Sequence, residues 1–410
     1  MDYSFSATWG GDFDAGHSQT ILMPSSSDGD RRLLLIAWNP QAFVDTMREA
    51  QSHSASDGGY RASVWFHETF DGFAGSWPDT ASDYPALWSP DDELSWRNPS
   101  MILITPMEAG IALDMSDSDV SIQLAGGARG DLLRGGGGDD ILRGFGGRDT
   151  LDGGDGADTL DSGEGGGLLI GGAGNDILLA RSGTSTVYGG EGDDWLSGSG
   201  PGVMAGDAGD DIIIIASTSS GLAFGGAGDD TLYGLALFNH LRGDDGDDVM
   251  SAGAMEDTLV GGAGNDLAFG GYGTDILYGE DGNDQLRGDG GSDLLYGGDG
   301  DDTLVGGYDM ADSDTLVGGS GNDDLYGERG YDFFVIGFGS GSDVIHDFSR
   351  TGLATGRVEF LDGIFSSFEA VMVVSHEVGE DVVIEISATD RVTLLNQSLS
   401  LFSASDFVFG

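Results

Sequence analysis

A nine-residue repeat fills the middle of the chain and limits the folds that it can adopt. Residues 135–143 read Gly-Gly-Gly-Gly-Asp-Asp-Ile-Leu-Arg, and further units follow directly at residues 144–152 and 153–161. The general form is Gly-Gly-x-Gly-x-Asp-x-apolar-x, and about 23 units fit between residues 126 and 335. A nine-residue period matches neither one face of a helix nor a heptad. It predicts a short strand with one inward apolar side chain, joined to a tight glycine-rich turn.

The charge of the chain excludes several classes of protein. The 410 residues include 71 Asp and Glu against 16 basic residues, all of them Arg, which gives a formal net charge of −55. The absence of Cys excludes disulfide scaffolds and Cys-ligated zinc sites. A nucleic-acid interface needs clustered cations, and a membrane span needs about 18 consecutive apolar residues. The sequence offers neither, so we expect no nucleic-acid partner and no transmembrane segment.

Glycine and negative charge are concentrated in the repeats. Residues 126–335 hold 58 of the 75 Gly and 41 of the 71 acidic residues, whereas six of the seven Trp lie before residue 126. These shifts in composition predict three domains: an aromatic-rich head at residues 1–125, a repeat domain at residues 126–335 and an apolar tail at residues 336–410.

The nonapeptides resemble those of the repeats-in-toxin (RTX) family, also known for its hemolysin-type calcium-binding repeat. The resemblance implies a right-handed parallel β-roll in which two units make one turn of 18 residues. It also implies that Ca2+ ions lie between stacked turns, bound by Asp carboxylates and by glycine-rich backbone carbonyls. The predicted fold class is mainly β: a β-roll with a small α/β or α+β N-terminal domain and a C-terminal β cap.

Physical chemistry favours the same cofactor. Calcium accepts six to eight oxygen ligands in irregular geometry. Carboxylates stacked one strand spacing apart, about 4.8 Å, repel one another unless a cation lies between them. A core of one apolar side chain per strand is too thin to offset the chain entropy, so metal binding should be part of folding. Without calcium, we expect the repeats to be a disordered acidic segment.

The sixth position of each unit supplies the predicted metal ligands. The 18-residue period sorts these residues into two rows, one on each edge of the roll. The first row is unbroken and consists of Asp140, Asp158, Asp176, Asp194, Asp211, Asp230, Asp248, Asp266, Asp284, Asp302 and Asp323. The second row consists of Asp131, Asp149, Asp257, Asp275, Asp293, Asp314 and Asp332. Stacked pairs in the two rows suggest roughly 15 calcium sites.

The second row is interrupted in its middle. Gly167, Ser185 and Asn239 stand at sixth positions there, and we expect this edge to lack calcium between roughly residues 162 and 251. The loops of this interval are apolar, and ninth-position side chains such as Tyr188 and Phe224 should point outward. Three explanations remain open: sequence drift in a redundant array, an intramolecular dock for the head, or a surface for an external partner.

The tail contains a predicted cap. Residues 331–348 resemble the unit that closes the β-roll in serralysin-type RTX proteins. Residues 370–374, 381–386 and 391–395 are short segments rich in apolar side chains, and we expect them to be strands that cover the open end of the roll.

The two ends of the chain suggest a route of export. The last residues, 406–410, read Asp-Phe-Val-Phe-Gly and are similar to an uncleaved type I secretion signal. Residues 1–4 show no basic or apolar start of a Sec-type leader. We therefore expect a secreted, extracellular protein whose export partner is a type I secretion exporter. Its weak calcium sites would stay empty in the cytosol and fill outside the cell.

The head carries no recognisable catalytic motif. Strands are predicted at residues 31–38, 60–70 and 101–107, and a helix from Asn39-Pro40 through Ala50. His67-Glu68 has no second His four residues on, so the zinc-protease motif is absent.

The predicted function is a secreted calcium-binding RTX protein that carries a small binding or surface-associated head, with no catalytic residue assigned. Aromatic residues of the head, or the outward Tyr residues of the roll, could bind a carbohydrate or cell-surface ligand, or could simply pack. The alternative is a small extracellular hydrolase with its active site in residues 1–125. His17, His53 and His67, with Asp71, are the candidates for that chemistry.

Overall fold

The computed structural model describes the backbone of four strands before residue 105 and most of residues 112–410 with their side chains. Residues 120, 217–219, 309–311, 349–353 and 362 lie outside this description, as does the remainder of the head. The helix expected from Asn39 and the residues His17, His53, His67 and Asp71 therefore fall outside the described residues.

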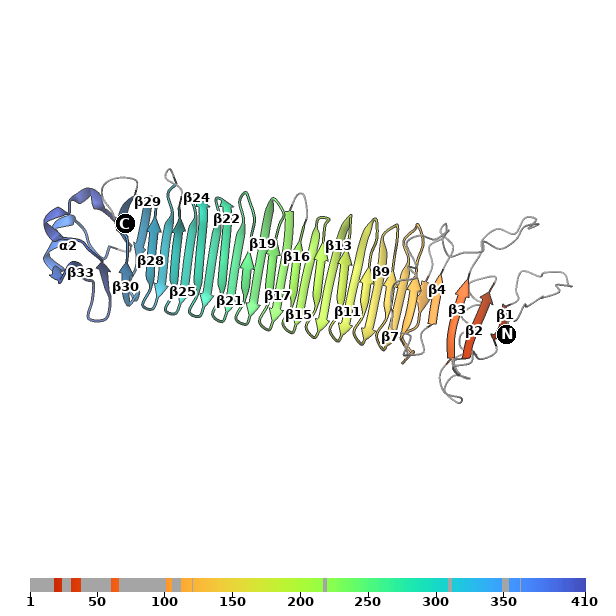
Figure 1. The fold of residues 1–410 in the computed structure, drawn as a ribbon. Coiled ribbons are helices and arrows are strands. Elements are labelled where there is room, and N and C mark those ends of the chain that lie inside the picture. Colours follow the sequence, from red (N-terminus) through yellow and green to blue (C-terminus); the bar gives the residue numbers. More distant parts are fainter. Residues whose placement is uncertain are drawn as a thin grey trace.

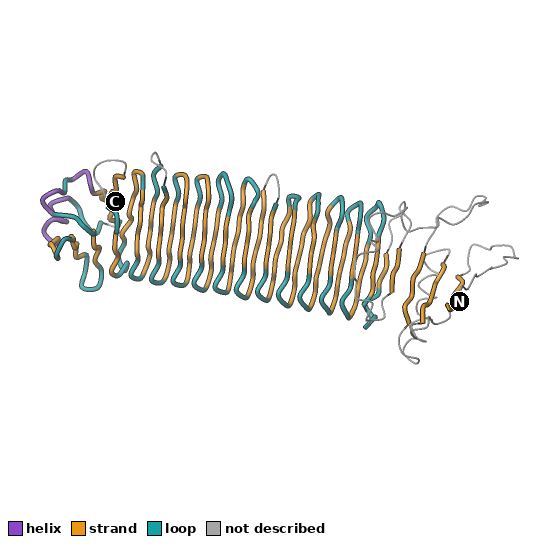
Figure 2. The backbone as a smooth tube through the Cα atoms, in the orientation of Figure 1, coloured by secondary structure: helices purple, strands orange, loops and turns teal. Residues whose placement is uncertain are grey.

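Parallel strands stack along one axis and form the long body of the molecule (Figure 1). Each 18-residue turn contributes one strand to each of two sheets, and every strand pairs with the strand one turn on. Leu160 pairs with Leu178 in one sheet, and Leu169 pairs with Val187 in the other. Figure 2 shows strands alternating with loops that line two edges. The predicted mainly β, parallel roll is confirmed.

Within the described residues, the first sheet has 20 strands. In the order of their pairing they are β1 (Ser18–Met23), β2 (Arg31–Ala37), β3 (Tyr60–Trp65), β4 (Met101–Ile104), β6 (Ile122–Ala125), β8 (Ile141–Arg143), β10 (Thr159–Asp161), β12 (Ile177–Ala180), β14 (Trp195–Gly198), β16 (Ile212–Ile215), β18 (Thr231–Gly234), β20 (Val249–Ser251), β22 (Leu267–Gly273), β24 (Gln285–Gly291), β26 (Thr303–Gly307), β28 (Asp324–Glu328), β30 (Ser342–Ile345), β34 (Arg391–Leu394), β33 (Asp381–Glu385) and β32 (Ser375–Val378).

The second sheet has 15 strands. They are β5 (Ala112–Asp114), β7 (Leu132–Gly137), β9 (Asp149–Asp155), β11 (Gly166–Ala173), β13 (Thr184–Glu191), β15 (Gly202–Ala208), β17 (Ser220–Ala227), β19 (Phe238–Asp245), β21 (Thr258–Ala263), β23 (Ile276–Asp281), β25 (Leu294–Asp299), β27 (Thr315–Ser320), β29 (Gly330–Ile336), β31 (Ala354–Phe360) and β35 (Phe407–Phe409).

The core is a single column of side chains from each sheet. The eighth residue of each unit points inward, and Leu142, Leu160 and Leu178 are fully buried in the first sheet, as Leu133 and Leu151 are in the second. Flanking residues at the seventh and ninth positions alternate outward. This alternation explains why one apolar residue per unit suffices to specify the strand.

The N-terminal end of the first sheet continues into the head. β4 pairs with β6 in parallel, and β3, β2 and β1 follow in turn. β2, β3 and β4 lie where strands were predicted at residues 31–38, 60–70 and 101–107, although the structure describes only the first six residues of the middle segment. Hydrogen-bonded pairing of the roll thus begins before residue 126, at β5 and β6.

One expected cap strand is a helix. Residues 370–374 belong to α2 (Phe368–Val374), whereas the strands expected at 381–386 and 391–395 are β33 and β34. Ser367 begins the helix because its side chain accepts a hydrogen bond from the backbone N–H of Ala370, and Val371 is the residue that the helix buries. A short continuous run of apolar residues such as 370–374 does not distinguish a strand from a helix. Two short 3₁₀ helices, Leu399–Leu401 and Ala404–Asp406, complete the cap.

Candidate metal centre

Two rows of buried aspartates run along the edges of the roll. The first edge is the side whose turns lead from the second sheet to the first sheet, as at residues 135–140. The second edge is the opposite side, whose turns lead from the first sheet to the second sheet, as at residues 144–149. All eighteen sixth-position aspartates predicted as ligands are buried, none more than 4% exposed. Buried carboxylates without a cationic partner are costly, so this burial requires an explanation.

One oxygen of each carboxylate holds the backbone of the preceding turn. Oδ1 of Asp158 accepts a hydrogen bond from the backbone N–H of Asp140 at 2.7 Å, and Oδ1 of Asp176 accepts the N–H of Asp158 at 2.7 Å. The same link is repeated between successive aspartates on both edges. The sequence period is thereby converted into a continuous chain of hydrogen bonds between turns.

In Asp131 the other oxygen, Oδ2, accepts the backbone N–H of Gly127, but in most of the described aspartates it has no hydrogen-bond partner. Oδ2 is buried and accepts no hydrogen bond in Asp140, Asp149, Asp158, Asp176, Asp194, Asp211, Asp230, Asp248, Asp257, Asp266, Asp275, Asp284, Asp293, Asp302 and Asp323. An unpaired buried carboxylate oxygen costs about 1–3 kcal/mol or more when charged. A row of such atoms is the donor set that a hard cation would satisfy.

The first-position glycine brings a second kind of oxygen to the same place. A Cβ built on Gly135 would overlap both Oδ2 of Asp140 and the carbonyl oxygen of Gly153 one turn on. Only glycine leaves room for the carboxylate there, and the carbonyl lies beside it. In the part of the chain that the structure describes, no three acidic or His side chains converge on a point. The site is therefore one carboxylate per turn supplemented by backbone carbonyls, and these residues fit calcium.

Burial raises the pKa of these carboxyls. The pKa rises to about 8 for Asp140 and Asp230 and to about 7 for Asp266. Desolvation is the largest cause, the accepted backbone N–H opposes it, and stacked carboxylates such as Asp158 beside Asp140 add to it. Without metal, Asp140 and Asp230 therefore hold protons near neutral pH, and a cation that binds there displaces them.

Two features of the first edge were missed by the sequence analysis. The row continues to Asp343, whose Oδ1 accepts the N–H of Asp323 at 3.3 Å; its 20-residue offset hid it. In addition, fifth-position side chains form an exposed row beside the first, in which Asp193 accepts the N–H of Asp210 and Asn283 accepts that of Asp301. The recurrence of Asn or Asp at this position was a signal available in the sequence.

The interruption of the second row is present in the structure. Gly167, Ser185, Gly202, Gly221 and Asn239 stand in line between Asp149 and Asp257. None of these five residues offers a carboxylate. The apolar residues of the same interval divide between core and surface: Leu169, Val187 and Met204 are buried, whereas Tyr188 is 40% exposed.

The outward aromatic residues pack along the strands. The rings of Tyr278 and Tyr296 stack at 5.0 Å, and Tyr326 stacks on His346 at 4.1 Å. Cross-strand packing of this kind stabilises neighbouring strands. A ligand for these rings stays a prediction.

Comparison with known proteins identifies the repeats. The family described as RTX calcium-binding nonapeptide repeat (4 copies) matches residues 125–160, 170–200, 224–254, 252–286, 278–307 and 308–334. No curated protein matches the chain.

Solved structures also match. One of them is the crystal structure of extracellular lipase LipA from Serratia marcescens, at 19% identity and a TM-score of 0.29, covering 53% of this chain and 42% of that chain. The match thus spans about two fifths of the length of that lipase. Within the described residues, no helix is long and apolar enough to cross a membrane.

Proposed function

Since the RTX calcium-binding nonapeptide repeat family matches six segments between residues 125 and 334, we propose that the chain is a secreted protein whose roll folds on extracellular Ca2+ after type I export. In this proposal residues 126–335 are the calcium-binding domain, residues 336–410 are the cap and secretion signal, and residues 1–125 are a small binding or surface-associated head. The eighteen buried aspartates are its calcium ligands.

The observation that carries the proposal is the row of unpartnered Oδ2 atoms beside backbone carbonyls. Calcium, when bound, would supply the positive charge that these oxygens lack. The chain itself contributes the rest: Oδ1 of these aspartates fixes the preceding turn, and first-position glycines keep room for the carboxylate. Without the cation, burial of so many carboxylates opposes folding, which favours an extended chain before export.

The decisive experiment follows β structure against free calcium. The purified chain is treated with excess EGTA, then titrated with Ca2+ while circular dichroism is recorded, and bound metal is counted by mass spectrometry. We expect little β signal in EGTA, a cooperative gain with Ca2+, and no comparable gain with equal Mg2+, which prefers a rigid octahedral site. A β signal that persists fully in EGTA, or a folded protein that retains no calcium, would overturn the proposal.

A further inference from the structure

We propose that the second edge between Ser162 and Asn239 is a seam in which protein atoms do what calcium does elsewhere, so that this stretch is held without metal. We call it the seam. The inference rests on the proposed calcium ligation by the aspartate rows. The proposal differs from sequence drift, one of the explanations left open for the interrupted row. It requires side chains that compensate for the missing carboxylates, whereas drift requires none.

The first and sixth positions of a unit compete for one space. In the metal-binding turns a Cβ at the first position, as on Gly261, would overlap Oδ2 of the sixth-position aspartate, here Asp266. A unit that loses its aspartate can therefore accept a side chain at the first position. This occurs in two units of the seam. One has Ser162 at the first position and Gly167 at the sixth, and the other has Ala180 at the first position and Ser185 at the sixth.

Ile215 shows the exchange most clearly. It is 2% exposed, and a Cβ on Gly221, which stands in the interrupted row, would lie 2.5 Å from Cγ2 of Ile215. One turn earlier, Cε of Met204 fills the space beside Gly198. Apolar side chains thus occupy the volume that carboxylates occupy elsewhere, and their burial stabilises the turn without a cation.

Asn239 closes the C-terminal end of the seam with an amide. Its Nδ2 donates to the carbonyl oxygens of Gly234 at 3.2 Å and Ala236 at 3.1 Å, and to Oδ1 of Asp257 at 2.8 Å. Three acceptor oxygens surround Nδ2 of Asn239. This arrangement fixes the orientation of the amide, because a flipped amide would place Oδ1 against those three oxygens. The neutral amide therefore sits among oxygens as a cation would. One turn on, the second edge departs from this exchange, because it keeps Ala252 at the first position together with Asp257, the aspartate whose Oδ1 accepts this amide.

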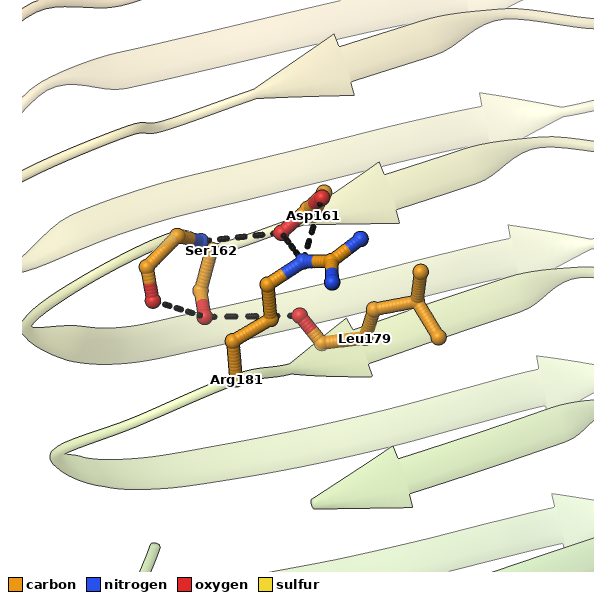
Figure 3. A network of polar contacts seen from close by, with 5 residues as sticks. Asp161, Ser162, Leu179 and Arg181 are labelled. Carbon is orange, nitrogen blue, oxygen red and sulfur yellow. Dashed lines mark hydrogen bonds and ion pairs between the residues drawn. The ribbon is translucent and has the colours of Figure 1, made fainter. Parts of the chain in front are cut away.

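The N-terminal end is closed by an arginine and a hydroxyl (Figure 3). Nε of Arg181 donates to both carboxylate oxygens of Asp161, at 2.9 and 2.8 Å. Oγ of Ser162 contacts the carbonyl oxygens of Gly163 and Leu179, both at 3.4 Å. Here too the chain supplies its own cation and its own donor to oxygens on the second edge.

The test restores a sixth-position carboxylate within the seam. Asn239→Asp places a carboxylate between the same carbonyls and Asp257, so we expect one additional calcium ion per chain by mass spectrometry after gel filtration. The matched control is Asn283→Asp, which adds the same charge to the exposed fifth-position row, where Asp301 already stands; its calcium content should be unchanged. An unchanged calcium content in Asn239→Asp would overturn the seam. A wild-type chain without calcium would instead overturn the proposed function.

A second measurement needs no variant. Hydrogen exchange of the wild-type chain at calcium levels that half-saturate it should show that second-edge amides of the seam, such as those of Ser185 and Asn239, stay protected. Second-edge amides of the block from Asp275 to Asp332 should lose protection under the same conditions. Equal calcium dependence in the two segments would contradict the proposal, whether or not Asn239→Asp folds.

Discussion

The two edges of the roll follow different rules. On the first edge, eleven six-residue turns each begin with Gly and end with Asp, from residues 135–140 to 318–323. The second edge has turns of unequal length, and it replaces carboxylates by Ser, Gly, Asn and apolar residues in its middle. Under the proposed calcium binding, the first edge keeps one turn length and one pair of end residues, whereas the second edge varies in both, even in the turn from Gly306 to Asp314, which keeps its aspartate.

The pH should affect calcium binding by the aspartate rows of both edges, and this is the largest effect that we expect. Since burial raises the pKa of Asp140 to about 8 and of Asp275 to about 7, protons compete with calcium in the aspartate rows below these values. Lowering the pH from 7.5 to 6 should raise the calcium concentration at the folding midpoint by about tenfold or more. Calorimetry in buffers of different ionisation enthalpy should detect protons released as calcium binds. A midpoint independent of pH would mean that the rows are already ionised.

Without calcium, folding should depend on pH in the opposite direction. These aspartates bind protons more tightly in the folded chain than at their ordinary value of 3.8, so folding without metal is favoured below that value and disfavoured as the pH rises through about 7. Circular dichroism in EGTA should therefore show more β structure at pH 4.5 than at pH 8.

A first-position glycine provides the next test. Gly279→Ala places a Cβ against Oδ2 of Asp284, so we expect about 1–3 kcal/mol of destabilisation and the loss of a bound calcium. The seam carries Ala at the same position, in Ala180, without harm because Ser185 replaces the aspartate. Calcium-saturated denaturant unfolding measures the effect. Gly337→Ala is the control, because no atom lies within 4 Å of its Cβ position; equal losses in both variants would contradict the steric argument.

The smallest change removes one charge. Asp266→Asn keeps an oxygen to accept the N–H of Asp248 but replaces the unpartnered Oδ2 by an amide, as Asn239 does in the seam. We expect the variant to fold and to bind one calcium ion fewer. Asp247→Asn, in the fifth-position row where Asn265 and Asn283 already occur, should bind as the wild type does. The comparison would fail if both variants lost calcium equally.

The repeat made much of the fold predictable, because each unit states its own strand, turn and buried aspartate. Asp140 and its row could be placed from spacing alone, as could the interruption at Gly167 and Ser185. What sequence could not show depends on contacts across turns. The three acceptors of the Asn239 amide come from its own turn and the next, and Asp343 joins its row through an irregular offset. The helix at Phe368–Val374 depends on its N-terminal cap, Ser367, which the pattern of apolar residues did not indicate.

The spacing of the carboxylates has a consequence for how such a chain can change its length. Successive first-edge aspartates are 17 residues apart from Asp194 to Asp211, 19 from Asp211 to Asp230 and 21 from Asp302 to Asp323, yet each accepts the N–H of the one before. The added or missing residues lie in second-edge loops. Because the backbone of each turn pairs with the turns on either side of it, whole turns can be duplicated or deleted while the pairing of the others is kept. The roll can thus lengthen by the addition of whole turns, and its calcium content would increase in proportion.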